Sequence, residues 1–258
     1  MTELEFHFHA EVAFSAPVSG HTFALHCLPV EDDAQKLQSY AVCIEPAAGY
    51  GLHRDGFGSW LVCGSCREPH TMFCYASHGI VQVEGYAQAE PVNPVLKQFT
   101  ELTAMTEELE TLWQSLPLEG KSPQKRAELL NQAAADSLHY VPGVTGIITT
   151  AGQALTLGSG VCQDYAHILL ALARRSGFAA RYCMGLVPGE GATHAWVEIA
   201  LPDGWHGYDP TFACEAGEDH LRFAVGRDAA DCRAERGVFR GMADQTLHTE
   251  MRLNVRNG

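Results

Sequence analysis

Three residues that could together open an amide bond follow one another along the chain as Cys162, His194 and Asp209. Acyl transfer through cysteine needs a thiolate, a base that generates it and later protonates the leaving amine, and a group that orients the base. The three residues fit these roles as nucleophile, base and orienting acid. Their types and order predict cysteine-dependent acyl transfer from an amide.

Cys162 is expected in the first turn of a buried helix. Gly158 and Gly160 interrupt the chain before it, and an almost unbroken apolar run over 165–173 follows and ends in two arginines and Gly177. A first turn has unpaired backbone N–H groups and the positive end of the helix dipole, which favour a thiolate. The N–H of the cysteine could also serve as one oxyanion-hole donor. The competing interpretation is a small buried apolar residue.

His194 and Asp209 are expected to be neighbours at the open end of a β-hairpin. Residues 194–200 and 205–208 predict two strands joined by a tight turn. Because proline cannot continue a central ladder, Pro210 ends the second strand at the aspartate. The aspartate would hold one nitrogen of the imidazole and leave the other for the thiol.

Two further residues near these three are candidates for a role at the site. Trp196 is two places from His194, so strand alternation gives both side chains the same face. It could shield the imidazole and contact substrate, or pack in the core as tryptophan usually does. His167 lies five positions beyond Cys162, which turns it away around the helix and favours a structural role.

The first third of the chain alternates between apolar and polar residues. From Leu4 to Phe14 the apolar side chains fall on one face, which is typical of a half-buried antiparallel strand. Shorter runs separated by turn signals follow at 22–27, 40–44, 59–62, 71–75 and 80–84. Their regular spacing predicts an antiparallel β-sandwich-like domain over residues 1–93.

After Pro94 the apolar period changes to that of helices. Apolar residues at helical spacing predict one helix over 102–116. Ser122 has the character of an N-cap, and Pro123 that of the first helical position, so a second helix is expected to begin there. Both helices are predicted to be scaffold elements.

The chain is acidic. Its 258 residues include 17 Lys and Arg against 31 Asp and Glu, a formal net charge of −14. We therefore expect neither nucleic acid nor an anionic membrane surface as a partner. The N-terminus has neither a basic region nor an apolar leader segment, and no apolar run reaches membrane-spanning length, so a cytoplasmic location is expected.

The nine cysteines form an odd set without the density of a disulfide scaffold, and mostly reduced thiols are expected. Cys63, Cys66, His70 and Cys74 have a spacing that could hold structural zinc. Against zinc, Cys63 and Cys74 fall in or beside predicted strands, whose alternation would point ligands to opposite faces. We assign no metal and no cofactor, and zinc stays the alternative.

Several stretches of the chain resemble a known family, the transglutaminase-like superfamily. Those similar to its successive core motifs are Gly160-Val-Cys-Gln-Asp-Tyr-Ala-His167, Gly177-Phe-Ala-Ala-Arg-Tyr182, His194-Ala-Trp-Val-Glu198, and Gly204-Trp205 with Asp209-Pro-Thr211. Those similar to bacterial members described as candidate cysteine proteases are Asp55-Gly-Phe-Gly58, Pro69-His70, Gly226-Arg-Asp228 and Gly237-Val-Phe-Arg-Gly241. The likeness covers nearly the whole chain.

The resemblance implies an α+β fold. The β-rich domain over 1–93 would precede a papain-like catalytic core over 94–258, in which a central helix packs on an antiparallel sheet and a C-terminal strand follows. It also implies the three catalytic roles already given. Ser59 and Phe212 stand where the family often has asparagine, and the second difference bears on the loop beside the site.

The expected function is hydrolysis of a peptide, isopeptide or other amide, with a peptide or protein as substrate. Transfer of a glutamine acyl group to an amine is the alternative, and the choice depends on whether water reaches the thioester. An inactive binding or scaffold protein on the same fold is a third possibility, although all three catalytic roles are filled. The oligomeric state and the second oxyanion donor stay open.

Overall fold

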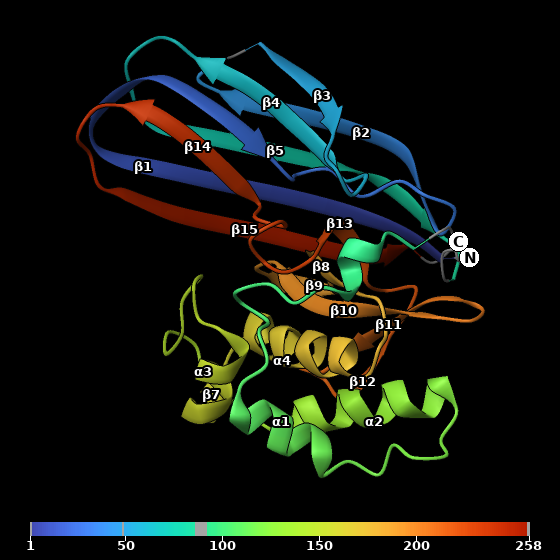
Figure 1. Ribbon diagram of the computed structural model, residues 1–258. Coiled ribbons are helices and arrows are strands. Elements are labelled where there is room, and N and C mark those ends of the chain that lie inside the picture. The colour runs from blue at the N-terminus through green and yellow to red at the C-terminus, as the bar shows by residue number, and fades with distance from the viewer. Residues whose placement is uncertain (1, 48, 86–91, 257–258) are drawn as a thin grey trace.

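The computed structural model describes residues 2–47, 49–85 and 92–256. Two antiparallel sheets and a group of helices are stacked in layers (Figure 1). The N-terminal sheet lies at the top of that view, the second sheet lies beneath it, and the helices cover the lower side of the second sheet. The predicted α+β fold with an N-terminal β region is confirmed.

Strand β1 (Thr2–Leu25) is the centre of the N-terminal sheet. Alternate residues from Leu4 to Phe14 are buried, as their period of two predicts. Along this stretch β1 pairs with β5 (His70–Val83) on one side and with β15 (Gln245–Arg256) on the other. The strand is therefore covered on both edges and one face.

Some strands expected to be short are parts of longer ones. Most of the run at 22–27 continues β1, because an irregular register between Ala13 and Val18 absorbs the turn signal without ending the strand. The run at 71–75 and all but the last residue of the run at 80–84 belong to β5. Turn residues in the sequence thus predict more strand ends than the structure has in β1 and β5.

The other strands of this sheet flank the centre. They are β2 (Gln35–Glu45), which pairs with β5, β4 (Trp60–Cys66) and β14 (Glu235–Arg240), which pair with the second half of β1, and β3 (Tyr50–Arg54), which pairs with β4. Since β14 and β15 come from the end of the chain, the N-terminal sheet contains C-terminal strands. The domain boundary at 93/94 stays a prediction, and residues 86–91, just before it, lie outside the described residues.

The second sheet contains the predicted hairpin. Its order is β12 (Cys214–Ala216), β11 (Gly204–Asp209), β10 (His194–Leu201), β8 (Ala180–Leu186) and β13 (Leu221–Gly226), all antiparallel. The connection from β8 to β10 contains the short β9 (Gly189–Gly191), which pairs with β15 of the N-terminal sheet. The segment that links two strands of the second sheet thus contributes an edge strand to the N-terminal sheet.

Helix α4 (Cys162–Arg175) packs on β8 and β10 and has the predicted ends. Every residue over 164–174 is buried. Gly177, with φ of +87°, follows the helix in the left-handed conformation that glycine adopts most easily. Because the helix is apolar around most of its circumference, it forms the centre of the lower layer.

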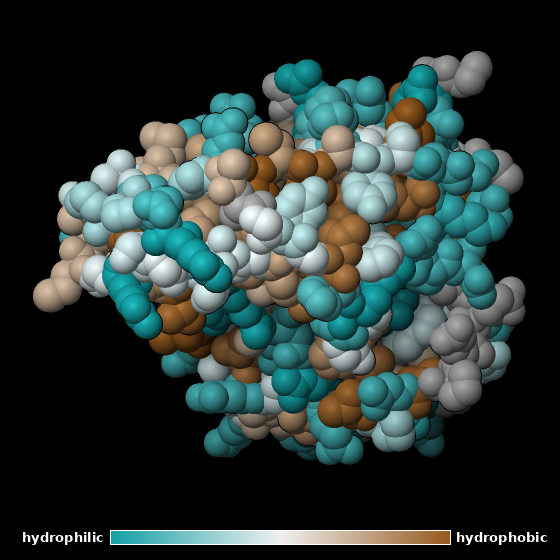
Figure 2. Space-filling view, turned by 90° about the horizontal axis from the view of Figure 1, so that it is seen from above, coloured by the Kyte–Doolittle hydropathy of each residue, from teal (hydrophilic) through white to brown (hydrophobic). Residues whose placement is uncertain are grey.

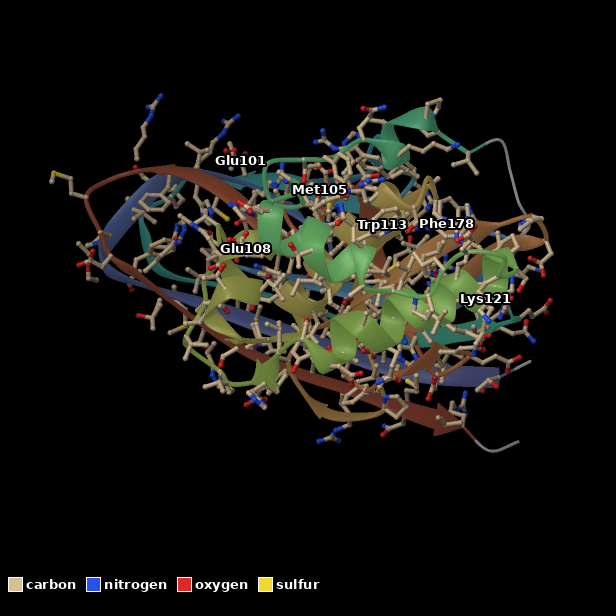
Figure 3. All side chains as sticks on the ribbon, turned by 60° about the horizontal axis from the view of Figure 1, so that its bottom comes forward. Glu101, Met105, Glu108, Trp113, Lys121 and Phe178 are labelled. Carbon is tan, nitrogen blue, oxygen red and sulfur yellow. The ribbon has the colours of Figure 1, made fainter. Side chains whose placement is uncertain are left out.

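The other helices surround α4. They are the short η1 (Pro94–Lys97), α1 (Glu107–Gln114), α2 (Pro123–Asp136) and α3 (Ala151–Leu157). The predicted cap of α2 is confirmed, because Ser122 Oγ accepts a hydrogen bond from Lys125 N at 3.2 Å. Helix α1 starts later than predicted because Thr106 caps it. Figure 3 shows Trp113 of α1 near Phe178, and the Arg175 guanidinium lies 3.9 Å from the Trp113 ring.

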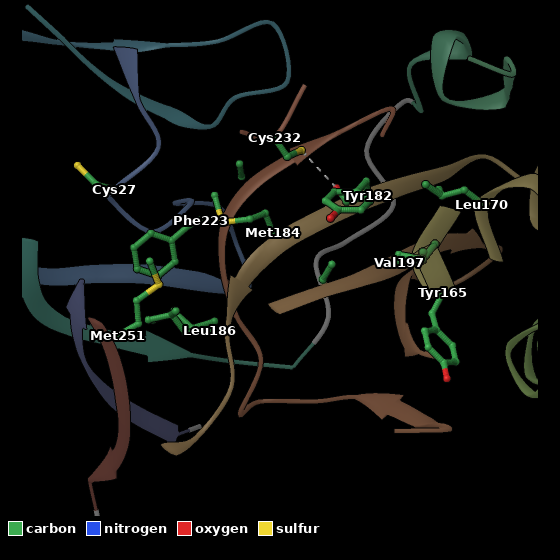
Figure 4. Packing of buried hydrophobic residues seen from close by; sticks show 14 of the residues in the cluster. Cys27, Tyr165, Leu170, Tyr182, Met184, Leu186, Val197, Phe223, Cys232 and Met251 are labelled. Carbon is green, nitrogen blue, oxygen red and sulfur yellow. Dashed lines mark hydrogen bonds between the residues drawn. The ribbon is translucent and has the colours of Figure 1, made fainter. Parts of the chain in front are cut away.

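Aromatic and aliphatic side chains fill the space between the two sheets. The ring of Phe223 on β13 lies 5.4 Å from that of Phe6 and 5.4 Å from that of Phe8, both on β1. Leu186 and Met251 lie beside Phe223 in the same cluster (Figure 4). One apolar core therefore spans both layers.

The outer surface over the N-terminal sheet carries hydrophilic and hydrophobic residues side by side (Figure 2). Among the residues that the structure describes, no helix combines the length and apolarity needed to cross a membrane.

Candidate active site

Cys162 is the first residue of α4, and three neighbouring segments fix it there. Helix α3 ends at Gly158, whose φ of +67° turns the chain into the short β7 (Ser159–Gly160). This strand pairs with β6 (His139–Tyr140) in a parallel ladder. Val161 then forms the N-cap, so the thiol projects from the first turn and is half-buried.

The Asp164 carboxylate stabilises this turn. Its Oδ2 accepts hydrogen bonds from Val161 N at 2.8 Å and from the Thr145 hydroxyl at 2.7 Å. Burial raises the pKa of Asp164, although these two hydrogen bonds oppose the change. A Cβ on Gly160 would lie only 2.6 Å from the same oxygen, so the approach to the helix requires glycine.

The N–H of Cys162 is free for a ligand. In the described parts of the chain it has no hydrogen-bond acceptor, whereas the N–H groups of Val161, Asp164 and Tyr165 all do. An unpaired N–H beside a nucleophile can stabilise an oxyanion. The geometry thus fits the expected donor.

His194, the first residue of β10, and Asp209, the last of β11, meet as the hairpin predicts. Nε2 of His194 lies 2.6 Å from Oδ2 of Asp209, and both side chains are buried. Burial alone would lower the pKa of His194, but hydrogen bonds to Asp209 and to the Cys162 thiol, with the charges of both groups, raise it from 6.5 to about 9. The imidazole therefore interacts with both partners at once.

Asp209 is held on both oxygens. Oδ1 accepts hydrogen bonds from the backbone N–H of Thr211 at 2.8 Å and of Phe212 at 3.3 Å. Burial tends to raise the pKa of Asp209, but hydrogen bonds from His194 and His220 outweigh burial and hold that pKa well below its usual range. The carboxylate stays ionised and cannot rotate.

His220, just before β13, is a residue that the sequence did not single out. Its Nε2 lies 3.3 Å from Asp209 Oδ2, and its Nδ1 lies 2.7 Å from Asp219 Oδ1. No motif points to it, because the loop that holds it reaches the site through the pairing of β13 with β8. Only the fold of the sheet brings it to Asp209.

Aromatic rings pack against the imidazole. The ring of Trp196 stacks with His194 at 6.2 Å and meets His220 edge-on at 5.2 Å, and the ring of Phe212 stacks with His194 at 5.0 Å. Trp196 is 1% exposed and packs in the interior beside the imidazole. Its role in substrate binding stays a prediction. Phe212 is 59% exposed and covers the imidazole from the solvent side.

Tyr140 is a second residue that the sequence did not assign. It is 54% exposed on β6 beside the first turn of α4, and burial together with the charge of Cys162 raises its pKa. Tyr140 therefore lies within electrostatic reach of the thiol.

His167, by contrast, is fully buried and accepts a hydrogen bond from Ala229 N at 3.2 Å, as a structural histidine would.

Three of the four residues of the zinc alternative contact different groups. Cys66 donates to the Pro46 carbonyl, His70 contacts His21 at 3.3 Å, and Cys74 contacts Glu11 at 3.9 Å. Among described residues, no group of three or more His, Cys, Asp or Glu side chains is placed to hold a metal ion.

A helix that begins at a cysteine, packed on a sheet that presents a histidine and an aspartate, has the groups that thiol-dependent acyl transfer requires. Residues 111–210 match the family model of the transglutaminase-like superfamily, and residues 4–82 match that of the bacterial transglutaminase-like N-terminal region. The chain belongs to the transglutaminase-like superfamily.

Similar proteins are found in mycobacteria and among solved structures. An uncharacterized protein of Mycobacterium leprae is 29% identical over 221 residues, which are 76% of this chain and 78% of that protein. One of Mycobacterium tuberculosis H37Rv is 27% identical over 243 residues, 80% of this chain and 77% of that protein. A candidate cysteine protease from Cytophaga hutchinsonii has a TM-score of 0.81 at 18% identity, over 100% of this chain and 92% of that chain, which shows a shared fold.

Proposed function

We propose that the protein hydrolyses peptide or isopeptide amides, with Cys162 as nucleophile, His194 as base and Asp209 as the acid that orients the base. The observation that carries the proposal is that His194 binds Asp209 at 2.6 Å and also interacts with the Cys162 thiol. A thiol, an imidazole and a carboxylate in series meet the needs of acyl transfer.

The reaction would proceed in two steps. His194 takes the proton of Cys162, the sulfur adds to the amide carbonyl, and the Cys162 N–H stabilises the oxyanion. The C–N bond then breaks, the leaving amine takes the proton from the imidazolium, and a thioester remains. In the second step His194 takes a proton from water, and the resulting hydroxide adds to the thioester carbonyl. The C–S bond then breaks, the carboxylic acid product leaves, and the Cys162 sulfur takes its proton back from the imidazolium.

Asp209 supports both steps. Its carboxylate fixes the tautomer and the direction of the imidazole and stabilises the positive charge that the ring acquires. The four hydrogen bonds around that carboxylate supply the rigidity that orientation needs. The exposed Phe212 limits the access of water to the ring.

The test is a screen of the purified protein on peptide, isopeptide and glutamine–amine substrates, with Cys162→Ala as the inactive variant. Cys43→Ala, at an exposed cysteine on β2, is the matched control. Hydrolysis that the first variant abolishes and the second leaves unchanged supports the proposal. Transfer to an amine without hydrolysis would make the protein a transglutaminase, and equal turnover by both variants would refute a role for Cys162.

A further inference from the structure

A cavity of about 500 Å³ lies between the two layers, and its wall includes residues next in the chain to the proposed nucleophile and base. Gln163 and Thr193, which are the chain neighbours of Cys162 and His194, form part of its wall. Residues of β8 and of the segment before β14 continue the wall, and Figure 4 shows Tyr182, Met184 and Cys232 among them. A substrate chain that leaves the thiol on this side would enter the cavity.

The walls are mostly apolar. Apolar lining residues from both layers are Val12, Ile147, Met184, Phe239, Leu247 and Met251. The volume falls within the range of about 300–1,000 Å³ that holds a drug-sized ligand, so the cavity has room for much more than a glutamine side chain. A peptide segment with a long side chain fits it better.

Glu235 is the acid in this cavity. The Tyr75 hydroxyl, 1% exposed, donates a hydrogen bond to its carboxyl group. Burial raises the pKa of Glu235, and that hydrogen bond opposes the rise. In the described part of the chain, no Lys or Arg forms an ion pair with it. A cation that entered the cavity would relieve this unfavourable burial of charge.

The other titratable groups around the cavity do not replace such a cation. Arg233 lines it, but its side chain is exposed to solvent, which screens its charge. Burial, and next the proximity of His70, lower the pKa of His21 to about 4, so His21 is neutral. The net charge of −14 further attracts basic substrates.

We propose that this cavity is the substrate subsite for a lysine or arginine side chain next to the scissile amide. The apolar walls contact the methylene groups, and Glu235 binds the cationic head. The inference rests on the proposed hydrolysis and adds the class of peptide that is cleaved. Ile147, which lines the cavity and is 62% exposed, and its chain neighbour Ile148, which is 76% exposed, offer an apolar surface for the peptide backbone around that side chain.

The experiment compares peptides that differ only in one residue beside the amide, which is lysine, norleucine or glutamate. We expect kcat/KM for the lysine peptide to exceed that for the norleucine peptide by about tenfold or more. The reason is the charged hydrogen bond between the lysine ammonium and Glu235 in a partly dehydrated site. Glu235→Gln should lower kcat/KM for the lysine peptide by about tenfold or more and so remove this preference. A preference for norleucine or glutamate, or a preference for lysine that survives Glu235→Gln, would overturn the inference.

A second variant tests the location by filling the cavity. Leu247→Trp adds bulk at an exposed lining position, and Val255→Trp, also on β15 but outside the cavity, is its control. The first should lower kcat/KM for the lysine peptide about tenfold or more by excluding its side chain, while alkylation of Cys162 by iodoacetamide stays unchanged. Equal kinetics for the two variants would place the side chain elsewhere.

Binding separates this inference from the proposed hydrolysis. If no peptide is cleaved, fluorescence anisotropy of the labelled lysine peptide is measured with the unmodified protein and with Glu235→Gln. Binding that the substitution weakens supports the subsite while the hydrolytic function fails. Binding that is equal for both proteins, or absent, overturns the subsite.

Discussion

His220 contacts Asp209 at 3.3 Å through Oδ2, the same carboxylate oxygen that His194 contacts at 2.6 Å. Since two backbone N–H groups occupy Oδ1, every side of this buried carboxylate is engaged. A fully bonded acid holds the imidazole of His194 in one orientation. His220 is therefore a positioning residue that acts through the aspartate.

Replacing His220 should impair the site without removing any reacting group. In His220→Leu, Asp209 loses one donor, so its orientation of His194 weakens, and we expect the rate of Cys162 alkylation by iodoacetamide near neutral pH to fall about tenfold. A tenfold change is about 1.4 kcal/mol, close to the lower end of the about 1.5–3 kcal/mol that a hydrogen bond to a charged group contributes. The measurement is the alkylation rate as a function of pH.

His220→Gln is the matched variant because its amide can still donate to the carboxylate. It should keep most of the alkylation rate and the shape of the pH profile. If His220 were purely structural, Cys162 would be alkylated at the same rate in both variants and with an unchanged pH profile. The variants would then differ only in their free energy of unfolding.

The local parts of the site could be predicted from the sequence. Cys162 lies in a first helical turn because glycines precede an apolar helix, and His194 and Asp209 meet because a short turn joins their strands. These relationships depend on residues close together in the chain, where periodicity and turn residues are informative.

The remaining parts depend on pairing between distant segments. His220 reaches Asp209 through the pairing of β13 with β8, and β15 completes the N-terminal sheet by pairing with β1. Alternation shows which face of a strand is buried but not which strand lies beside it. The cavity with Glu235 arises from that same pairing, so the sequence did not predict it.

The stability of the protein should depend on the protonation of His194. Its pKa is raised from 6.5 to about 9, so the folded state binds this proton more tightly than the unfolded state. The contribution is fully present below pH 6.5 and is lost as the pH rises to about 9. We expect the free energy of unfolding to fall over this window by up to about 3 kcal/mol, measured by urea titration.

His194→Gln is the control for this titration, because it removes the titrating group and keeps a polar side chain. The difference in unfolding free energy between the two proteins should be large in mildly acidic solution and shrink as the solution becomes alkaline. A difference that is constant with pH would contradict the raised pKa of His194.

Gly160→Ala should disturb the turn that holds the nucleophile. The added Cβ would lie 2.6 Å from Asp164 Oδ2, which caps the N-terminus of α4 through Val161. We expect a loss of about 1–3 kcal/mol in the free energy of unfolding, together with slower alkylation of Cys162. Gly146→Ala is the control, since no atom lies within 4 Å of its Cβ position. Equal effects of both substitutions would mean that the contact with Asp164 is relieved without cost.

Arg222 is expected to join the two layers through buried charge. Its guanidinium contacts Asp32, in the connection between β1 and β2, at 2.9 Å and Glu198 of β10 at 3.5 Å, and Arg222 itself is 5% exposed. Burial alone would lower the pKa of Arg222, but the Glu198 and Asp32 charges raise it. Arg222→Met should therefore cost about 3–5 kcal/mol of unfolding free energy, because it leaves the buried Glu198 and the partly buried Asp32 without this partner.

The matched control for Arg222→Met is Lys125→Met, which breaks an exposed pair with Glu128 at 2.7 Å. Because water screens that pair, we expect a change below about 0.5 kcal/mol. If the two substitutions were equally mild in urea titrations at neutral pH, the buried pairs of Arg222 would not hold the layers together. If Arg222→Met alone is destabilising, Asp32→Asn in the same background should recover part of the loss, since it removes the partly buried charge that has lost its partner.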